Sequence, residues 1–111
     1  MATDVRDAPD HSRYEVTVDG ELAGFAEYRD VDGARVFTHT EVFDAFEGEG
    51  VGSALARGAL DDVRGEGRRL VALCPFVAAY IDHHDEYADL VDRSLDASLR
   101  AQGDDQGAAN R

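Results

Sequence analysis

Hydrophobic and polar residues alternate along the first half of the chain. Apolar residues occupy positions 14, 16 and 18, with polar residues between them. A period of two is typical of a strand with one buried and one hydrated face. Apolar runs over 22–28 and 35–42 follow, each preceded by an Asp-Gly pair. Because Asp-Gly favours tight hairpin turns, residues 14–42 are predicted to form a three-stranded antiparallel meander.

The hydrophobic period changes after residue 50. Apolar residues recur at 51, 55, 59 and 63, and Ser53, Arg57 and Asp61 lie on the opposite side, as an amphipathic helix requires. The run 68–74 fits a buried strand, and helical spacing returns over 76–84 and again over 86–100. Since such crossovers are right-handed, the fourth strand should lie parallel to the third. The pattern therefore predicts an α/β (α+β) fold, a meander followed by a helix–strand–helix crossover.

The length of 111 residues suits one domain with a single core. Residues 1–12 are polar and without periodicity, and we expect a flexible N-terminal tail there. Residues 101–111 are similar in character and are expected to be a disordered C-terminal tail. The domain is therefore predicted to span residues 13–100.

The charge balance is strongly acidic, with 24 Asp and Glu against 11 basic residues, all of them Arg, and a net charge of −13. Nucleic acid and anionic membranes need a basic face, so neither is expected as a partner. Carboxylates in this excess repel one another in dilute salt and are screened in concentrated salt. The Lys-free acidic composition indicates a salt-rich cytoplasm of the halophilic archaeal kind. The N-terminus lacks an apolar segment, which predicts a cytoplasmic location.

Three glycines, at alternate positions, and two glutamates lie in the stretch 47–52, between a predicted strand and a predicted helix. Glycines let a ligand approach the backbone, and the start of a helix presents free N–H groups and the positive end of its dipole. Such a loop can bind a phosphate without a basic side chain. The alternative interpretation is a plain acidic turn before a helix.

The surrounding stretch "TEVFDAFEGEGVGSALA", residues 40–56, resembles the coenzyme A-binding motif of the GNAT N-acetyltransferase superfamily. "HTEV" at 39–42, "CPF" at 74–76 and "HDEY" at 84–87 resemble signatures of its compact, stand-alone members. The resemblance covers roughly residues 14–91 and includes the order of the predicted elements. It implies the GNAT-like core, acetyl-CoA as cosubstrate and an amine as acceptor.

The resemblance also implies which residues bind coenzyme A. Where the family usually has Arg or Gln, this chain has Glu47, so backbone donors must hold the pyrophosphate and binding should be weaker at low salt. The implied cofactor-binding residues are Val42, Glu47, Gly48, Glu49, Gly50, Val51, Gly52 and Ser53.

Four residues are candidates for catalysis. His39 and Glu41 are two apart on a strand, share a face and could supply a general base; the alternative is a packed His and a solvated Glu. Cys74, the single cysteine, ends the fourth strand, where a thiol could accept the acyl group, donate a hydrogen bond or simply be core. Tyr80 is a candidate general acid or a core aromatic.

These patterns predict an acyltransferase that moves an acetyl group from acetyl-CoA to a small-molecule, peptide or protein amine. A non-catalytic module that binds coenzyme A, or an interaction domain, is the alternative. The adjacent His83, His84 and Asp85 lack metal-ligand spacing, and no metal is expected. The sequence leaves the acceptor, the acyl-chain preference and the oligomeric state open.

Overall fold

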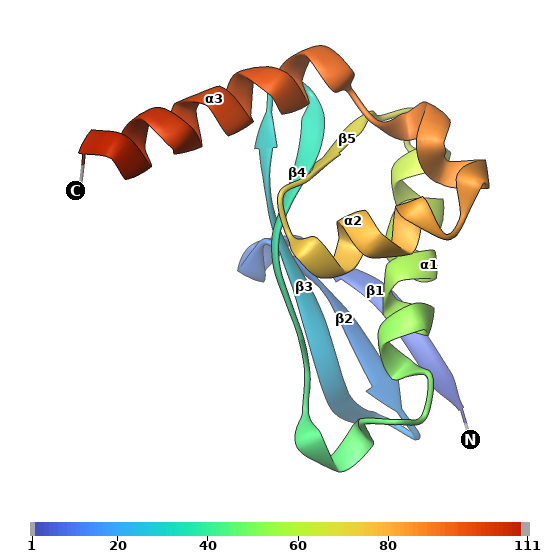
Figure 1. Cartoon of the computed structure of the whole chain (residues 1–111). Helices are drawn as coiled ribbons and strands as arrows, with labels where there is room; N and C mark the ends of the chain where they lie inside the picture. The colour runs from blue at the N-terminus through green and yellow to red at the C-terminus, as the bar shows by residue number, and fades with distance from the viewer. Residues whose placement is uncertain (1, 110–111) are drawn as a thin grey trace.

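The computed structural model describes the backbone of residues 2–109 and the side chains up to Gln102 (Figure 1). Its strands form one sheet in the order β1-β2-β3-β4-β5, antiparallel except for the parallel pair of β4 and β5, which confirms the predicted fold class. The strands are β1 (Thr3–Ala8), β2 (Arg13–Val18), β3 (Glu21–Val31), β4 (Ala34–Val42) and β5 (Leu70–Ala72). The helices are α1 (Val51–Gly65), α2 (Pro75–Asp82) and α3 (Arg93–Ala109), with short 3-10 helices η1 (Pro9–His11), η2 (Asp44–Phe46) and η3 (Asp85–Leu90).

Both hairpins turn at the Asp-Gly pairs that the sequence marks. Asp19 and Gly20 have φ of 51° and 86°, and Asp32 and Gly33 have φ of 53° and 84°. Two consecutive positive φ angles define the tight turn whose twist matches that of the flanking strands. The turn chemistry thus explains the meander from β2 to β4.

The segment expected to be a flexible N-terminal tail contains β1. It pairs with β2 along its whole length, from Thr3 opposite Val18 to Ala8 opposite Arg13. Val5 lies against Gly58 of α1, where a Cβ would come within 2.7 Å of the valine Cβ. Val5 is the one β-branched apolar residue in this segment and gives no periodicity by itself, so its docking depends on the space at Gly58, which exists only in the folded helix. The expected disordered tail over 101–111 falls mainly on residues whose side chains lie outside the described part, and the backbone of α3 continues to Ala109.

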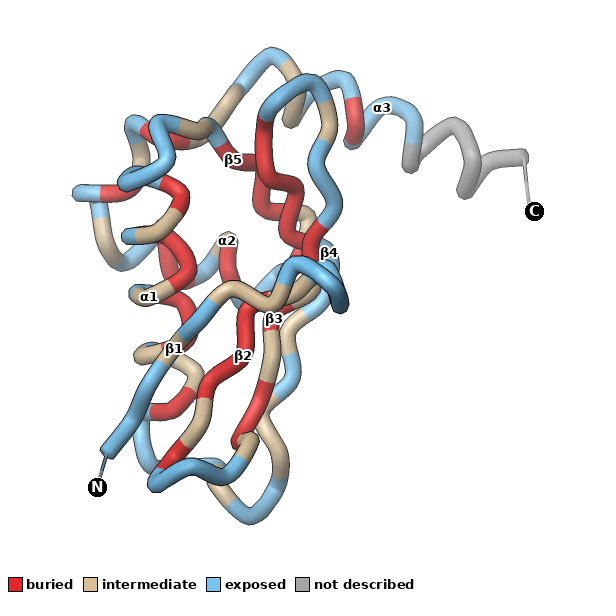
Figure 2. The backbone as a smooth tube through the Cα atoms, turned by 180° about the vertical axis from the view of Figure 1, so that it is seen from behind, coloured by how far each residue is buried: buried red, intermediate tan, exposed pale blue. Residues whose placement is uncertain are grey.

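Helices α1 and α2 cover one face of the sheet, and the buried side chains gather between them and the strands (Figures 1 and 2). The first turns of α3 cover the opposite face near β5, where Leu99 packs with Val36 and Val71. Farther along β4, on that same opposite face, His39 is exposed. None of the described helices is long and apolar enough to cross a membrane.

Arg35 lies buried at the start of β4 and connects four elements. Its guanidinium donates to Asp30 at 2.9 Å and to the Tyr14 hydroxyl at 2.8 Å, and it lies 4.0 Å from the centre of the Tyr28 ring. Tyr14 donates in turn to Asp62 of α1 at 2.6 Å. Burial, together with the hydrogen bond to Asp62, raises the pKa of Tyr14, so its hydroxyl stays a donor. This network fixes the paired end of β4 to the sheet and to α1.

Candidate functional site

Strands β4 and β5 form a fork. They pair only over Arg35 to Phe37, opposite Leu70 to Ala72. The N–H groups of Leu73 and Cys74 then both donate to the Phe37 carbonyl at 3.0 Å, and the chain turns into α2 at Pro75. Strand β4 continues to Val42 without a strand partner on this side, so the two strands separate after Phe37 (Figure 1).

A bulge in β4 decides which residues face the helices. Glu27 lies opposite His39 and Tyr28 opposite Phe37, so Thr38 is an extra residue in β4. Beyond it, Thr40 lies opposite the buried Ala26 and so faces α1 and α2. Thr40 and the partly buried Val42 therefore line the helix side of the fork, and His39 and Glu41 face the other side.

The Cys74 thiol lies at the base of the fork. It is 3% exposed and donates a hydrogen bond to the Thr40 hydroxyl, with 3.2 Å between sulfur and oxygen. Cys74 is also the residue just before α2, held by its N–H bond to Phe37. Cys74, a candidate predicted from the sequence, is thus hydrogen-bonded to Thr40, which the sequence did not indicate as a site residue. Thr40 belongs to the "HTEV" signature, but only the bulge shows that it turns toward the cysteine.

His39 and Glu41 share one face, as predicted. The Nε2 atom of His39 lies 3.5 Å from a carboxylate oxygen of Glu41, and the two side chains are 56% and 52% exposed. The His39 ring lies 6.1 Å from that of Phe25, which in turn lies under the Arg13 guanidinium. This solvent-facing pair stands on the opposite side of β4 from the Cys74 thiol, so the fork separates the candidate base from the candidate thiol.

The glycine loop leads into an uncapped helix. Gly48 and Gly50 have φ of 83° and 75°, and Gly50 is the N-cap residue of α1, without a side-chain hydrogen bond to cap the helix. The first helical bond runs from the Ala54 N–H to the Gly50 carbonyl, so the preceding N–H groups, those of residues 51–53, have no acceptor within the helix. These donors are available to an anion at the loop.

A groove of about 370 Å³ lies at this helix start. The Glu47 side chain lines this groove and is exposed, so its charge is hydrated. Gly52 is needed for a different reason from Gly50: a Cβ there would come within 2.8 Å of the Phe76 ring. The groove is lined by Val42, Phe46, Glu47, Gly48, Gly50, Val51, Gly52, Ser53 and Phe76.

Of the predicted cofactor-binding residues, the groove contains all but Glu49, whose side chain is exposed in the same loop. Phe46 and Phe76 line the groove but are outside the predicted set, although Phe46 lies in the motif stretch 40–56 and Phe76 in the "CPF" signature. A lone aromatic after a strand reads as core, and only the contact of α2 with the start of α1 brings Phe76 to the loop.

Tyr80 lies toward the far end of α2. It is six residues after Cys74, or ~9 Å along a helix axis. Its ring is stacked on that of His84, with centres 3.9 Å apart, and His84 donates to the Tyr80 carbonyl at 2.8 Å. Tyr80 is 8% exposed and belongs to the main core cluster. The Tyr80 ring thus packs on His84, whereas the Cys74 thiol is hydrogen-bonded to Thr40.

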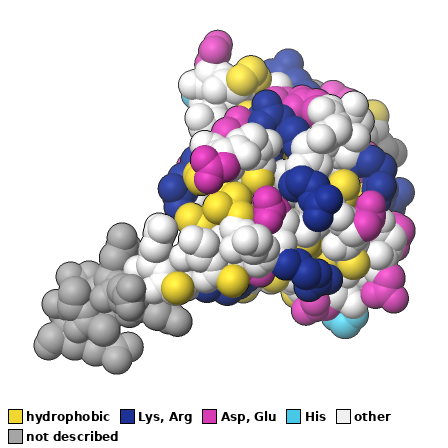
Figure 3. Space-filling view, turned by 90° about the horizontal axis from the view of Figure 1, so that it is seen from above, with side chains coloured by type: hydrophobic (Ala, Val, Ile, Leu, Met, Phe, Trp, Pro, Cys, Tyr) yellow, Lys and Arg dark blue, Asp and Glu magenta, His cyan; other side chains and the backbone are white. Residues whose placement is uncertain are grey.

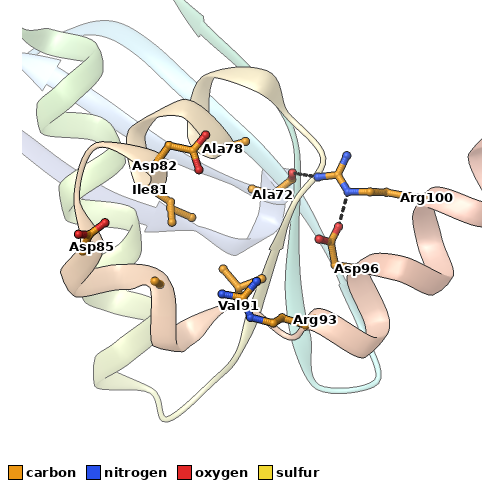
Figure 4. Close-up of a pocket in the computed structure, with 10 residues that line it drawn as sticks. Ala72, Ala78, Ile81, Asp82, Asp85, Val91, Arg93, Asp96 and Arg100 are labelled. Carbon is orange, nitrogen blue, oxygen red and sulfur yellow. Dashed lines mark hydrogen bonds and ion pairs between the residues drawn. The ribbon is translucent and has the colours of Figure 1, made fainter.

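A second hollow, of about 260 Å³, lies between α2, η3 and the start of α3 (Figure 4). Its floor includes Ala72 and Val91, and Arg100 spans one side by donating to the Ala72 carbonyl and pairing with Asp96. Seen from above, acidic and basic side chains are interspersed over this end of the molecule (Figure 3). The hollow shares no lining residue with the glycine-loop groove.

Among the described residues, Asp7, Asp62 and Glu66 form a group of carboxylates close enough to share a cation. Asp7 accepts from Tyr28 and Asp62 from Tyr14, so two of the three already have protein partners. The group lies beside the buried Arg35 network, on the β1 side of α1. We interpret it as part of that network.

The sheet order, the fork between parallel strands and the glycine loop at an uncapped helix define a class of protein. It is that of acyltransferases that hold coenzyme A between a strand fork and a helix start, the class that the sequence resembles.

Comparison with known proteins identifies the family. The profile of the family described as GCN5-related N-acetyl-transferase matches residues 13–90, and the chain belongs to this family. It is a GNAT-type acetyltransferase, whose reaction moves an acetyl group to an amine. Among curated proteins, none matches the chain significantly.

One solved structure agrees with this fold. A GCN5-like protein from Staphylococcus aureus, determined by NMR, superimposes with a TM-score of 0.61 at 22% identity, over 79% of this chain and 86% of that one. A ribosomal-protein-alanine N-acetyltransferase from Brucella melitensis biovar Abortus is 26% identical, with a TM-score of 0.49, over 71% of this chain and 60% of its own. The first of these supports the fold alone.

Proposed function

We propose that this acetyltransferase binds acetyl-CoA with the pyrophosphate at the glycine loop and the thioester in the fork. The observation that supports this most directly is the uncapped start of α1, where the N–H groups of residues 51–53 face a groove beside the open edge of β4. Backbone donors and the helix dipole together favour a phosphate there.

Strand β4 offers backbone hydrogen-bond donors to the pantetheine arm. The Phe43 N–H donates to Ala23 in β3, so period two directs the amide groups of Thr40 and Val42 toward the side that β5 has left. An amide-containing chain laid in the fork can therefore pair with β4 as a strand would. Such pairing brings the thioester end toward Phe37 and Cys74.

The two sides of the fork suit two halves of the reaction. In this proposal the amine approaches on the exposed side, where Glu41, with His39 beside it, takes the ammonium proton directly or through water. On the buried side, the Cys74 thiol donates a proton to the departing thiolate of coenzyme A and is held in place by Thr40. Tyr80 is the alternative donor, at the other end of α2.

The acceptor is proposed to be a cationic amine, because the chain carries a net charge of −13. A small polyamine and a basic peptide both fit this description. The test is release of free coenzyme A from acetyl-CoA with a panel of amines in molar KCl. Turnover only with neutral amines would contradict the preference for a cationic acceptor.

Salt should act in opposite directions on the two substrates. Screening removes repulsion between a phosphate and Glu47 or Glu49 that amounts to about 1 kcal/mol at 4 Å in water. Calorimetric titration should therefore show coenzyme A binding about 5-fold more tightly in molar KCl than in dilute buffer. The KM of a cationic acceptor should rise over the same range, because the attraction is screened as well.

Glu47→Gln is the matched control for this effect. It should tighten coenzyme A binding in dilute buffer and flatten the salt dependence, and leave the KM of the acceptor unchanged. Weaker binding of coenzyme A as KCl is added would contradict both the site and the proposed salt-rich cytoplasm.

Gly50→Ala should weaken coenzyme A binding. The left-handed backbone at this position, with φ of 75°, costs about 1–2 kcal/mol for a residue with a Cβ. The loop then relaxes and moves the N–H donors of α1, which predicts a roughly 10-fold loss in calorimetric affinity.

The control is Gly65→Ala at the other end of α1, where a Cβ would meet nothing within 4 Å. It should stabilise the fold by about 0.5–1 kcal/mol and leave the affinity for coenzyme A unchanged. Equal affinities for Gly50→Ala and the wild type would place the phosphate elsewhere.

A module that only binds coenzyme A is the second candidate, favoured by the departure at Glu47 from the family's basic position. It predicts calorimetric binding with no release of coenzyme A for any amine. Binding without turnover, over the whole amine panel and at molar KCl, would support that role over catalysis.

A further inference from the structure

Phe76 is the one large apolar side chain among the described residues that is exposed, at 40%. It is the second residue of α2, directly after Pro75, so its backbone is held by a helix start. A half-exposed ring on a rigid backbone can turn about its side-chain bonds within nanoseconds. The ring is therefore positioned but not enclosed.

The ring lies between two spaces. On one side is the glycine-loop groove, where a Cβ at Gly52 would come within 2.8 Å of the ring and 3.5 Å of Val42. On the other is a narrow apolar crevice under α1, too closely packed to hold a water molecule. The crevice is lined by Ala26, Phe37, Thr40, Leu55, Ala56, Ala59, Leu60, Phe76 and Val77. Phe76 is the residue common to both spaces.

The crevice borders the Cys74 thiol. Thr40 lines it and accepts the thiol hydrogen bond, and Phe37 lines it and accepts the Cys74 N–H. The thiol is nevertheless only 3% exposed. Phe76 therefore lies between the glycine loop and the residues that bond to Cys74.

We propose that Phe76 is a specificity-determining residue: its ring closes the passage between the glycine loop and Cys74 and restricts the acyl group to small chains. The proposal rests on the proposed function, because it takes the acyl-thioester to be the molecule that passes. The arm enters when the ring turns outward, and the ring then packs against the acyl group. A longer acyl chain occupies the space that the ring needs.

The first test measures access to the thiol and needs no substrate. Cys74 is the only cysteine of the chain, so labelling by a thiol-reactive disulfide reports this site alone. If the open state is a minor one, populated at about 0.1–10%, Phe76→Ala should raise the labelling rate by about 10-fold or more. Phe76→Leu, which keeps most of the bulk, should raise it much less.

Phe46→Ala is the matched control. Phe46 lines the glycine-loop groove but not the crevice, so the labelling rate should stay at the wild-type value. Because unfolding also exposes the thiol, the melting of each variant is followed by circular dichroism. A rate unchanged in Phe76→Ala, or raised only where the protein has melted, would overturn the proposal.

The second test compares acyl groups. Each additional methylene changes discrimination in an apolar pocket by about 10-fold or more. The ratio of kcat/KM for butyryl-CoA over acetyl-CoA should therefore rise at least about 10-fold in Phe76→Ala and stay constant in Phe46→Ala. An unchanged ratio would overturn the restriction on acyl size. Faster labelling without transfer of any acyl group would reject the proposed reaction and retain Phe76 as the barrier before the thiol.

Discussion

Cys74→Ala is expected to lower kcat by about 100-fold or more, the usual contribution of a positioned proton donor. The thiol is buried, bonded to Thr40 and located where β4 and β5 separate, so its loss leaves the departing thiolate without a neighbouring donor. The KM for acetyl-CoA should change little, because the pyrophosphate contacts at α1 remain. Steady-state release of coenzyme A measures both quantities.

Two companion variants decide the role of the thiol. Cys74→Ser keeps a donor and should recover part of the lost rate. Thr40→Val removes the hydroxyl that accepts the thiol bond and should lower kcat less than Cys74→Ala, with the folded state retained. An acetylated wild-type protein, seen by mass spectrometry after mixing with acetyl-CoA alone, would instead show that Cys74 is a nucleophile.

Tyr80→Phe separates the two candidate donors. If the thiol is the donor, removal of the Tyr80 hydroxyl leaves kcat within a few-fold of the wild type, because the ring still packs on His84. A loss as large as that of Cys74→Ala would assign proton donation to the tyrosine.

Arg35→Ala is expected to destabilise the fold by about 3 kcal/mol, at the lower end of the cost of removing one partner from a buried charged network. The variant loses the bonds to Asp30 and Tyr14 and the contact with the Tyr28 ring. Asp7, whose carboxylate lies 3.5 Å from the guanidinium, and Asp30 are 24% and 40% exposed; both can be hydrated once the arginine is gone, which limits the cost. Denaturation with guanidinium chloride gives the free energy of unfolding.

Arg29→Ala, an exposed neighbour on β3, is the control and should change stability by no more than about 0.5 kcal/mol. The network also predicts a pH dependence. The hydrogen bond from Arg35 lowers the pKa of Asp30, so this stabilisation is present above the ordinary pKa of aspartate and is lost as the pH falls through the lowered value. Equal stability of Arg35→Ala and Arg29→Ala would show that the network does not hold β4 in place.

Local patterns were enough to predict most elements of the fold. The Asp-Gly pairs at 19–20 and 32–33 determine both hairpins, because few other pairs accept two positive φ angles. The four-residue spacing from Val51 to Val63 predicts α1, and crossover handedness predicts the parallel pairing of β5. Strand β1 escaped prediction because its single inward valine depends on the notch at Gly58.

The candidate site was also predictable from the sequence only in part. The glycine loop could be found from sequence, since close backbone approach and a helix start are local properties of 47–53. The pairing of Cys74 with Thr40 could not, because the two residues are 34 apart and the bulge at Thr38 decides which way Thr40 faces. Phe76 likewise could not be predicted as a site residue, because only the packing of α2 against Gly52 brings its ring to the groove.

The sequence by itself determined the fold class, the loop that can accept a phosphate and the acidic surface, because these depend on residue type and near-neighbour spacing. Only the tertiary structure decided which side of β4 each candidate occupies. It placed His39 and Glu41 in solvent, the Cys74 thiol in the interior beside Thr40, and Tyr80 on His84. The physical reason is that one extra residue in a strand reverses the faces of all that follow, and the bulge depends on pairing between strands.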